Sequence, residues 1–550
     1  MSLMGSLYVG NSGLTMSQNA LNTTAHNMTN ADTVGYVRQQ VQQGTRVYNT
    51  LAVDFRAVSN QQIGLGVQYS KVKQIRDTFL DQTYRRESGR QAFYEVSSSA
   101  LEEVESLLDE LNGESFQESL EGLWTSIQEL GKDPSSAITQ GLLVQKSNQF
   151  LERAKSVYVG LSDFQDNLNL QVKTSVDKIN DYAKQIKSLN DQILKIECGG
   201  FERANDLRDA RDQILDELSK MAKISYQEDY NGNVNVQLED VDLVKAENYY
   251  EIGLQRDEVT GFYTPFWIQN ASYTLNDIGE KVYNIEGAEV FDLDRLISAD
   301  LNTDIGSLKS TMLARGDHRA NYTDLSEDKY TNSLSQSVIM NVQAEFDQLV
   351  HNVCSTMNRI LAESSDPATG YLCNPDGSPI QIFQKVGSDG YKQKDDGTWE
   401  FQEEDPNVNE SLYSVSNMII NKELVQNPTK LGFVKPDDSV DYETISKIKQ
   451  AFTAETNTLN PNVKKKTNFV DYYGDLVAQV ANSGSVFKSI VANQEATVNA
   501  TFSSREQVIG VSSDEELTNM VKFQNAYNAS SRYINVVNEM LAHLLNTLGQ

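Results

Sequence analysis

The residues best suited to chemistry are few and lie far apart in this chain of 550 residues, which contains four histidines. Its cysteines, Cys198, Cys354 and Cys373, are odd in number and form no CxxC pair. Neither a disulfide framework nor a cysteine zinc site is therefore expected. No HExxH, GxSxG or P-loop motif occurs, and no Cys/His/Asn set has a known catalytic spacing. We predict a protein that is not an enzyme, with no catalytic residue, no metal site and no cofactor.

One short stretch, residues 229–233 (DYNGN), has some of the oxygen ligands of a calcium loop. Its glycine is in the wrong place and the bidentate glutamate is missing. Alternating residues flank Asn231-Gly232, which is the strongest short signal for a β-hairpin. We therefore predict a hairpin here, and we interpret His26 as a polar turn residue rather than a ligand.

The charge balance excludes two classes of partner. The chain has 47 Lys and Arg against 77 Asp and Glu, a formal net charge of −30. Affinity for nucleic acid or for an anionic membrane surface is built from Lys and Arg contacts. We therefore expect neither partner. No apolar run is long enough to span a membrane, and the first residues lack the cationic region of a Sec signal peptide.

The elements at the two ends carry regular apolar stripes. A helix over residues 6–29 and a helix over residues 514–548 are both predicted from seven-residue spacing, which is typical of a coiled-coil seam. The stripe residues are Leu7, Leu14, Leu21 and Met28 in the first helix, and Met520, Tyr527, Ile534, Leu541 and Leu548 in the second. Before the second helix, Ser512 to Asp514 offer N-caps, and Glu515 or Glu516 is placed for a capping box.

Between the ends, helical and extended segments alternate. Residues 140–197 repeat apolar residues every seven positions and predict a long helix, interrupted only at Gly160. Helices are also expected from residue 76 to a break at Asn112-Gly113, over 201–224 and 305–362, from about residue 442, and over 467–506. Period-2 alternation predicts extended structure over 34–73. Turn signals at Asp389-Gly390 and Asp396-Gly397 are typical of a turn-rich insert over 370–413.

A narrow stripe needs one or two partner helices, and the two terminal stripes are natural partners for each other. Two helices alone leave apolar surface uncovered, so neighbouring subunits would have to supply the missing faces. The alternative is a pair that packs onto the helical body of its own chain. Periodicity does not decide between these two arrangements.

Three motifs carry a resemblance to a known family. They are residues 25–36 (AHNMTNADTVGY), residues 205–213 (NDLRDARDQ), and residues 514–532 followed by the NEML sequence at 538–541. The chain resembles the bacterial flagellar axial proteins, which form the rod, the hook and the hook–filament junction. The second motif is similar to one in the junction proteins. Val34 stands where the family usually has proline, which relaxes the elbow formed by Asn27, Asn30, Gly35 and Tyr36.

The resemblance implies a structural subunit of the flagellum that forms the hook–filament junction ring and adapts a flexible hook to a stiff filament. Its implied partners are other copies of itself, the hook protein, the second junction protein, the flagellar type III export apparatus and an export chaperone. The chaperone is expected to contact Tyr527, Ile534 and Leu541. The protein would be secreted and located on the flagellum outside the cell.

The predicted fold is mainly α with β-rich inserts, elongated and multidomain. We expect a terminal coiled-coil assembly domain (1–75 and 510–550), a helical bundle body (76–224, 306–365 and 436–509), a β-rich insert (225–305) and a second turn-rich insert (366–435). Two alternatives stay open: another axial role, as hook or second junction protein, and a surface adhesin or enzyme activity carried by the inserts.

Overall fold

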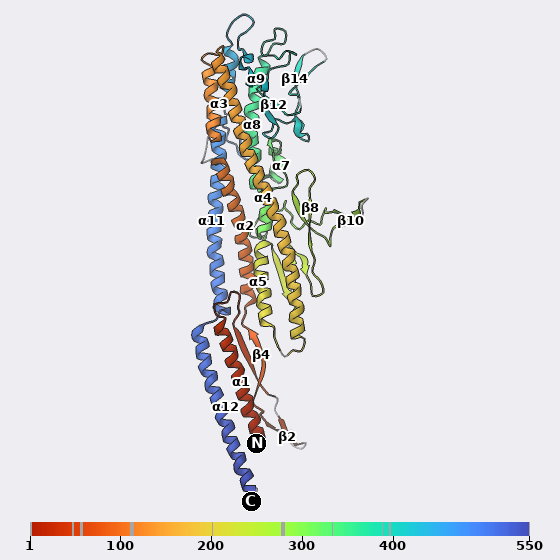
Figure 1. Ribbon diagram of the computed structural model, residues 1–550, viewed down its shortest axis with the longest axis vertical. Coiled ribbons are helices and arrows are strands. Elements are labelled where there is room, and N and C mark those ends of the chain that lie inside the picture. The colour runs from red at the N-terminus through yellow and green to blue at the C-terminus, as the bar shows by residue number, and fades with distance from the viewer. Residues whose placement is uncertain are drawn as a thin grey trace. The chain divides into compact units, whose positions relative to one another are not determined.

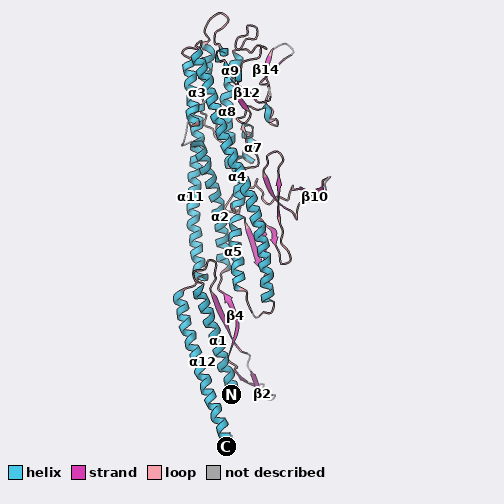
Figure 2. Cartoon of the chain, viewed as in Figure 1, coloured by secondary structure: helices cyan, strands magenta, loops and turns pink. Residues whose placement is uncertain are grey.

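The computed structural model describes residues 3–46, 49–54, 59–109, 115–200, 202–276, 281–332, 334–387, 389–394 and 398–548. Helices predominate and the strands form only small antiparallel sheets (Figure 2), which confirms the predicted fold class. Two compact units are present: unit 1 (residues 1–91, 177–252 and 494–550) and unit 2 (residues 92–176 and 253–493). The finer four-part division stays a prediction. The breaks predicted at Asn112-Gly113 and Asp396-Gly397 lie outside the described residues.

Unit 1 holds both ends of the chain. The terminal helices are α1 (Leu3–Thr29) and α12 (Ser513–Leu548), which lie side by side (Figure 1). After α1 come β1 (Gln39–Thr45), β2 (Asn49–Asp54), β3 (Ser59–Ile63) and β4 (Val67–Gln74), with β1 paired to β4 and β2 to β3. Unit 1 also contains α5 (Asn205–Met221) and a three-stranded sheet of β5 (Ile224–Glu228), β6 (Val234–Leu238) and β7 (Val241–Val244). The predicted hairpin is present, because Asn231-Gly232 lies in the β5–β6 turn.

Three long helices have residues in both units: α2 (Thr78–Asp109), α4 (Ala137–Glu197) and α11 (Phe469–Ile509). The predicted interruption of α4 at Gly160 is wrong, because the helix continues through it. A Cβ at this position would lie 2.9 Å from a methyl carbon of Leu107. The close approach of α2 therefore explains the glycine at this position, and the chain makes no turn there.

Unit 2 contains the larger core. Its other helices are α3 (Phe116–Leu130), α6 (Ser307–Arg315), α7 (Glu327–Asn332), α8 (Val338–Glu363), α9 (Lys422–Gln426) and α10 (Tyr442–Thr453). Its strands are β8 (Ile252–Arg256), β9 (Tyr263–Trp267), β10 (Ser272–Leu275), β11 (Lys281–Asn284), β12 (Phe383–Lys385), β13 (Tyr391–Gln393), β14 (Trp399–Phe401) and β15 (Met418–Ile420). Phe116 is fully buried, with ring centroids 5.3 Å from Phe150 and 4.8 Å from Phe346. Such aromatic packing joins α3, α4 and α8 into one core.

The single helix predicted over residues 305–362 is wrong, because α6 and α8 are separate helices with the short α7 between them. Gly316 ends α6 with a φ of 78°, a conformation that favours glycine. A short capped turn follows. The Asn321 side chain accepts from the Thr323 N–H at 2.9 Å, and the Asp324 side chain accepts from the Asn321 N–H at 3.0 Å. Ser337 then caps α8 by accepting from the Met340 N–H. Periodicity alone did not reveal this interruption, because both helices keep apolar residues at helical spacing.

Two carboxylates of α8 make the stability of unit 2 dependent on pH. Burial raises the pKa of Glu345 to about 7 and the pKa of Asp347 to about 7. In the unfolded chain both groups titrate near pH 4, so between pH 4 and 7 the folded state binds more protons. Their contribution to stability is therefore complete below pH 4 and is lost as the pH rises through 7.

We expect the urea midpoint of the protein to decrease between pH 5 and pH 8, and the Glu345→Gln variant to show a smaller decrease because the amide does not titrate. The amide oxygen can still accept from Asn460 and Gln479, which both donate to Oε1 of Glu345, at 2.7 and 3.1 Å. Exposed Glu403 provides the matched control, Glu403→Gln. An equal decrease in all three proteins would contradict the assignment.

Candidate functional site

The terminal helices pair antiparallel through unusually small residues. A Cβ at Gly10 would lie 2.7 Å from Cγ1 of Ile534, and one at Gly13 would lie 2.7 Å from Oγ of Ser530. The buried residues of α1 are Gly10, Met16, Ser17, Ala20, Thr24 and Asn27. Small side chains at seven-residue spacing, as at positions 10, 17 and 24, let two helices approach closely. Sequence reasoning missed this seam because it followed the large apolar residues.

The predicted stripe residues lie along the same pair but are only partly covered. Leu7, Leu14, Leu21 and Met28 of α1, and Met520, Tyr527, Ile534 and Leu541 of α12, are all half-buried. Leu548 ends α12, and its side chain lies outside the described residues. Further apolar side chains are exposed on the pair: Met4, Tyr8, Leu517, Val521, Tyr533, Val536, Met540, Leu544 and Leu545. The isolated chain therefore leaves a substantial apolar surface on its terminal helices.

The elbow after α1 is organised by one buried amide. Asn27 donates from Nδ2 to the Gln39 carbonyl at 2.8 Å, and its Oδ1 accepts from the Gln39 N–H at 3.0 Å. The same Oδ1 accepts from the Tyr36 hydroxyl at 2.8 Å. Asn30 donates to the His26 carbonyl at the end of the helix. The predicted elbow residues are thus brought together, and they attach the first residue of β1 to α1.

The turn itself depends on Gly35, which has a φ of 79°. Val34, at the position where proline is usual, is 84% exposed and free of packing constraints. The interpretation of His26 as a turn residue is wrong, because it lies in the last turn of α1, with its Nδ1 2.9 Å from the Tyr36 hydroxyl.

Replacing Asn27 by alanine is expected to lower the free energy of unfolding of unit 1 by about 2 kcal/mol, because the Gln39 N–H and carbonyl lose their buried partner. Hydrogen exchange at the Gln39 amide should become faster in the same variant. Asn22→Ala, an exposed change on the same helix, is the control and should have little effect. Unchanged protection of Gln39 in Asn27→Ala would show that this amide does not hold the elbow.

Arg38 joins the elbow to the start of α12. Its guanidinium pairs with Glu515 at 2.7 Å and with nearly buried Glu516 at 2.8 Å. Its backbone N–H donates to the Ile509 carbonyl at the end of α11. Ser512 caps α12 by accepting from the Glu515 N–H. The carboxylates of Glu515 and Glu516, one of which was predicted to complete a capping box, both bind Arg38.

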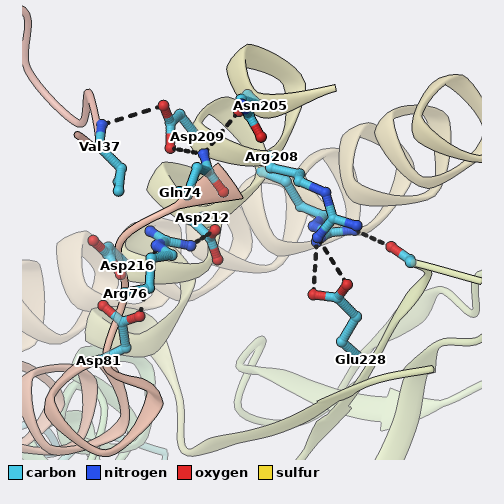
Figure 3. Close-up of polar contacts among 12 residues, drawn as sticks. Val37, Gln74, Arg76, Asp81, Asn205, Arg208, Asp209, Asp212, Asp216 and Glu228 are labelled. Atoms are coloured by element: carbon cyan, nitrogen blue, oxygen red, sulfur yellow. Dashed lines mark hydrogen bonds and ion pairs between the residues drawn. The ribbon is translucent and has the colours of Figure 1, made fainter. Parts of the chain in front are cut away.

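The α5 helix carries the motif at residues 205–213, and its polar side chains point into the structure (Figure 3). Asp209 accepts from the Val37 N–H at 3.2 Å and from Gln74 Nε2 at 2.6 Å. Gln74 also donates to the Asn205 carbonyl at 3.0 Å. Burial raises the pKa of Asp209 to about 7. One carboxylate therefore holds the end of β4 and the segment that leads into β1 against α5.

Next to it lies a balanced set of charges, which we call the polar hub: Arg76, Asp81, Arg85, Asp212, Asp216 and Arg505. Arg76 and Arg85 both pair with Asp212, and Arg85 also bonds Asp216 at 2.6 Å. Arg505 of α11 lies 2.7 Å from Asp81 and 2.8 Å from Asp216. Side chains this deeply buried tolerate charge only when it is paired, so the hub fixes α2, α5 and α11 to one another within unit 1.

Two further arginines of α5 hold the β5–β6 hairpin and the end of α4. Arg208 pairs with Glu197 of α4 at 2.7 Å and with Glu228 of β5 at 2.7 Å. Arg211 donates to Asn190 at 3.0 Å and to the Gly232 carbonyl at 2.7 Å. Burial lowers the pKa of Arg211 to about 10. These contacts position the β5–β6 hairpin and the end of α4 against α5. Both guanidinium groups are paired within the chain.

The described residues show no group of three or more His, Cys, Asp or Glu side chains placed to hold a metal ion. Cys198 is exposed, Cys354 is buried and Cys373 is half-buried, and all three are free thiols. None of the helices in the described part of the chain has the length and hydropathy that a membrane span requires.

Comparison with known proteins matches three family models to the chain. They describe the helical domain of flagellar hook-associated protein FlgK (residues 101–370), the flagella basal body rod protein (residues 7–36) and the C-terminal part of the flagellar basal body rod FlgEFG protein (residues 508–547). The two rod models therefore cover most of the elbow, α1 and α12. The FlgK model begins in α2 and ends in the second insert.

Full-length relatives are also found. Flagellar hook-associated protein 1 of Bacillus subtilis (strain 168) is 27% identical over 541 residues, covering 98% of this chain and 96% of the relative. The protein of the same name from Escherichia coli (strain K12) is 25% identical over 567 residues, covering 97% and 98%. The solved flagellar hook junction protein FlgK from Burkholderia pseudomallei has a TM-score of 0.52 at 12% identity, covering 78% of this chain and 100% of that one. This last likeness shows a shared fold.

Proposed function

Because this chain belongs to the flagellar hook-associated protein 1 family, whose members are structural proteins of the flagellum, we propose that its copies form the ring at the hook–filament junction. The observation that carries the proposal is the paired α1 and α12, which expose an apolar surface that one chain cannot cover. In a ring, neighbouring copies would cover it. The match of both helices to rod-protein models supports the same role for the chain ends.

The assembly interface is proposed to include the stripe residues of α1 and α12, namely Leu7, Leu14, Leu21, Met28, Met520, Tyr527, Ile534, Leu541 and Leu548. Partly covered apolar side chains gain further burial when a neighbour packs against them. The elbow of Asn27, Asn30, Gly35 and Tyr36 would turn the chain from this interface into the rest of unit 1. The polar hub would keep that turn rigid, so that force on the terminal helices is transmitted to the helical body.

The proposed partners are the hook protein on one side of the ring and the second junction protein on the other. We also propose that the chain leaves the cell through the flagellar type III export apparatus and works outside the cell. An export chaperone would contact Tyr527, Ile534 and Leu541. Since Ile534 lies against Gly10 of α1, chaperone and α1 would compete for one face of α12.

The test is a strain in which the gene is deleted. Electron microscopy should show hooks without filaments, and the medium should contain unpolymerised flagellin. Expression of the full chain from a plasmid should restore filaments. Normal filaments in the deletion strain would overturn the proposed junction role, and absence of hooks would point to a role in hook or rod assembly.

A further inference from the structure

We propose that a polar cavity in unit 2, within the second insert, binds an uncharged saccharide. This insert cavity has a volume of about 590 Å³. It is lined by side chains from the loop before β12, from the β13–β14 hairpin and from the start of α9. The inference does not rest on the junction role, because no residue of the terminal helices contributes to the cavity.

Two aromatic rings form one side of the cavity. Strand pairing places Gln393 opposite Trp399 and Tyr391 opposite Phe401, so Tyr391 and Trp399 project from the same face of the hairpin. Both rings are half-buried and line the cavity. An aromatic face with a polar tip is suited to pack against the C–H face of a pyranose ring, whose hydroxyl groups point outward at its edge.

The floor carries an amide that opens into the cavity and has no partner among the described residues. Gln381 is 7% exposed and lines the cavity, and its side-chain amide makes no hydrogen bond to any residue that the structure describes. A Cβ at position 390 would overlap this amide. Glycine at this position therefore leaves room for the Gln381 side chain. The amide lines the cavity and is available to a bound ligand. One amide both donates and accepts, and it therefore matches the two neighbouring hydroxyls of a sugar.

Around this floor, further amides are held in place. Asn421 donates to the Gln381 carbonyl at 3.0 Å, and Asn374 donates to Ser378 at 2.9 Å. Each fixes the backbone that presents the cavity wall. The arrangement of planar amides beside aromatic rings differs from the apolar lining that hydrophobic ligands prefer, and it favours a ligand rich in hydroxyl groups.

The charges at the rim select against anions. Asp376, Asp389 and Glu423 are exposed at the cavity, beside the ammonium of Lys422. Glu423 is paired with Lys430, so Asp376 and Asp389 outweigh Lys422. A sialylated or uronic sugar, a nucleotide or a phosphate would be repelled by this balance. The proposed ligand is therefore a neutral hexose or N-acetylhexosamine unit of a larger glycan.

The test uses the purified full-length chain and saturation-transfer difference NMR with lactose, N-acetyllactosamine and maltotriose. Sialyllactose serves as the charged counterpart of lactose. We expect at least one neutral saccharide to bind with a Kd of about 1 mM, as small, solvated ligands do, and sialyllactose to bind about tenfold more weakly or not at all.

Two variants locate the binding. Trp399→Ala removes a ring, and Gln381→Leu removes the amide while keeping its volume, which should leave folding intact because the amide has no protein partner. Each is expected to weaken binding by about tenfold. Tyr273→Ala, on the exposed β10–β11 hairpin, is the matched control and should bind as the parent does. Cells carrying Trp399→Ala should still assemble filaments.

The proposal is overturned if none of the three neutral saccharides gives a signal. It is also overturned if sialyllactose binds as well as lactose, or if Tyr273→Ala weakens binding as much as Trp399→Ala. Loss of filaments in the Trp399→Ala strain would show that this region serves assembly rather than saccharide binding. Each result leaves the deletion test of the junction role unaffected, so the two proposals fail separately.

Discussion

Cells that carry the Gly10→Val variant are expected to bear hooks without filaments and to be non-motile. A Cβ at this position would lie 2.7 Å from Cγ1 of Ile534 and 3.0 Å from the Tyr533 ring, whereas ordinary carbon contacts need about 3.5–4 Å. The two terminal helices must therefore separate. Overpacking of this kind costs about 1–3 kcal/mol, which shifts the pairing equilibrium by about tenfold or more.

The effect should be confined to the terminal pair. Hydrogen exchange in α1 and α12 should accelerate in the purified variant, while the midpoint of unfolding of the helical body stays unchanged. Asn11→Val, which places the same β-branched side chain on an exposed position of α1, is the control for helix propensity and should support normal filaments. If Gly10→Val cells were fully filamented, the close approach of α1 and α12 would not be needed for assembly.

Asp212→Ala is expected to lower the free energy of unfolding of unit 1 by about 3–5 kcal/mol, the largest stability loss we anticipate for one side chain. The change leaves the guanidinium groups of Arg76 and Arg85 without their shared carboxylate. Among the described residues, Arg76 then keeps only Asp81 as an ion-pair partner, at 3.8 Å, and Arg85, whose side chain is 3% exposed, keeps only Asp216. A buried charge that loses part of its pairing is costly. Urea denaturation followed by circular dichroism, with hydrogen exchange to assign the loss to unit 1, measures the effect.

Asp191→Ala is the matched control for Asp212→Ala. Asp191 also pairs with a cation, Lys187 at 2.6 Å, but its side chain is 46% exposed. Exposed pairs on one helix contribute about 0.5 kcal/mol or less. A loss below about 1 kcal/mol in Asp212→Ala would show that water reaches the polar hub and replaces the carboxylate.

Much of the helical framework could be predicted from the sequence. The apolar repeats at residues 140–197 correspond to the 61-residue helix α4, and the stripes at the ends correspond to α1 and α12. The hairpin at Asn231-Gly232 was also predicted correctly. These signals are local, since 3.6-residue and two-residue periods and turn residues act through neighbours in the chain.

The errors came from close packing between segments distant in sequence. Gly160 suggested a break but lies in an unbroken helix against Leu107, and the helix predicted over 305–362 is interrupted at Gly316. The seam of α1 was missed for the same reason. A glycine or serine that permits close approach of a partner helix carries no apolar signal of its own.

The sequence by itself determined most of the helices, the hairpin turn at Asn231-Gly232 and the residues of the terminal stripes, and it singled out the motif at 205–213. Only the tertiary structure decided what that motif does. Asp209 meets the Val37 N–H from 172 residues away, and Arg38 meets Glu516 from 478 residues away. Buried charges are stable only beside partners that neutralise them, and which partners these are depends on the folded path of the whole chain. The local periodicity of the sequence does not specify that path.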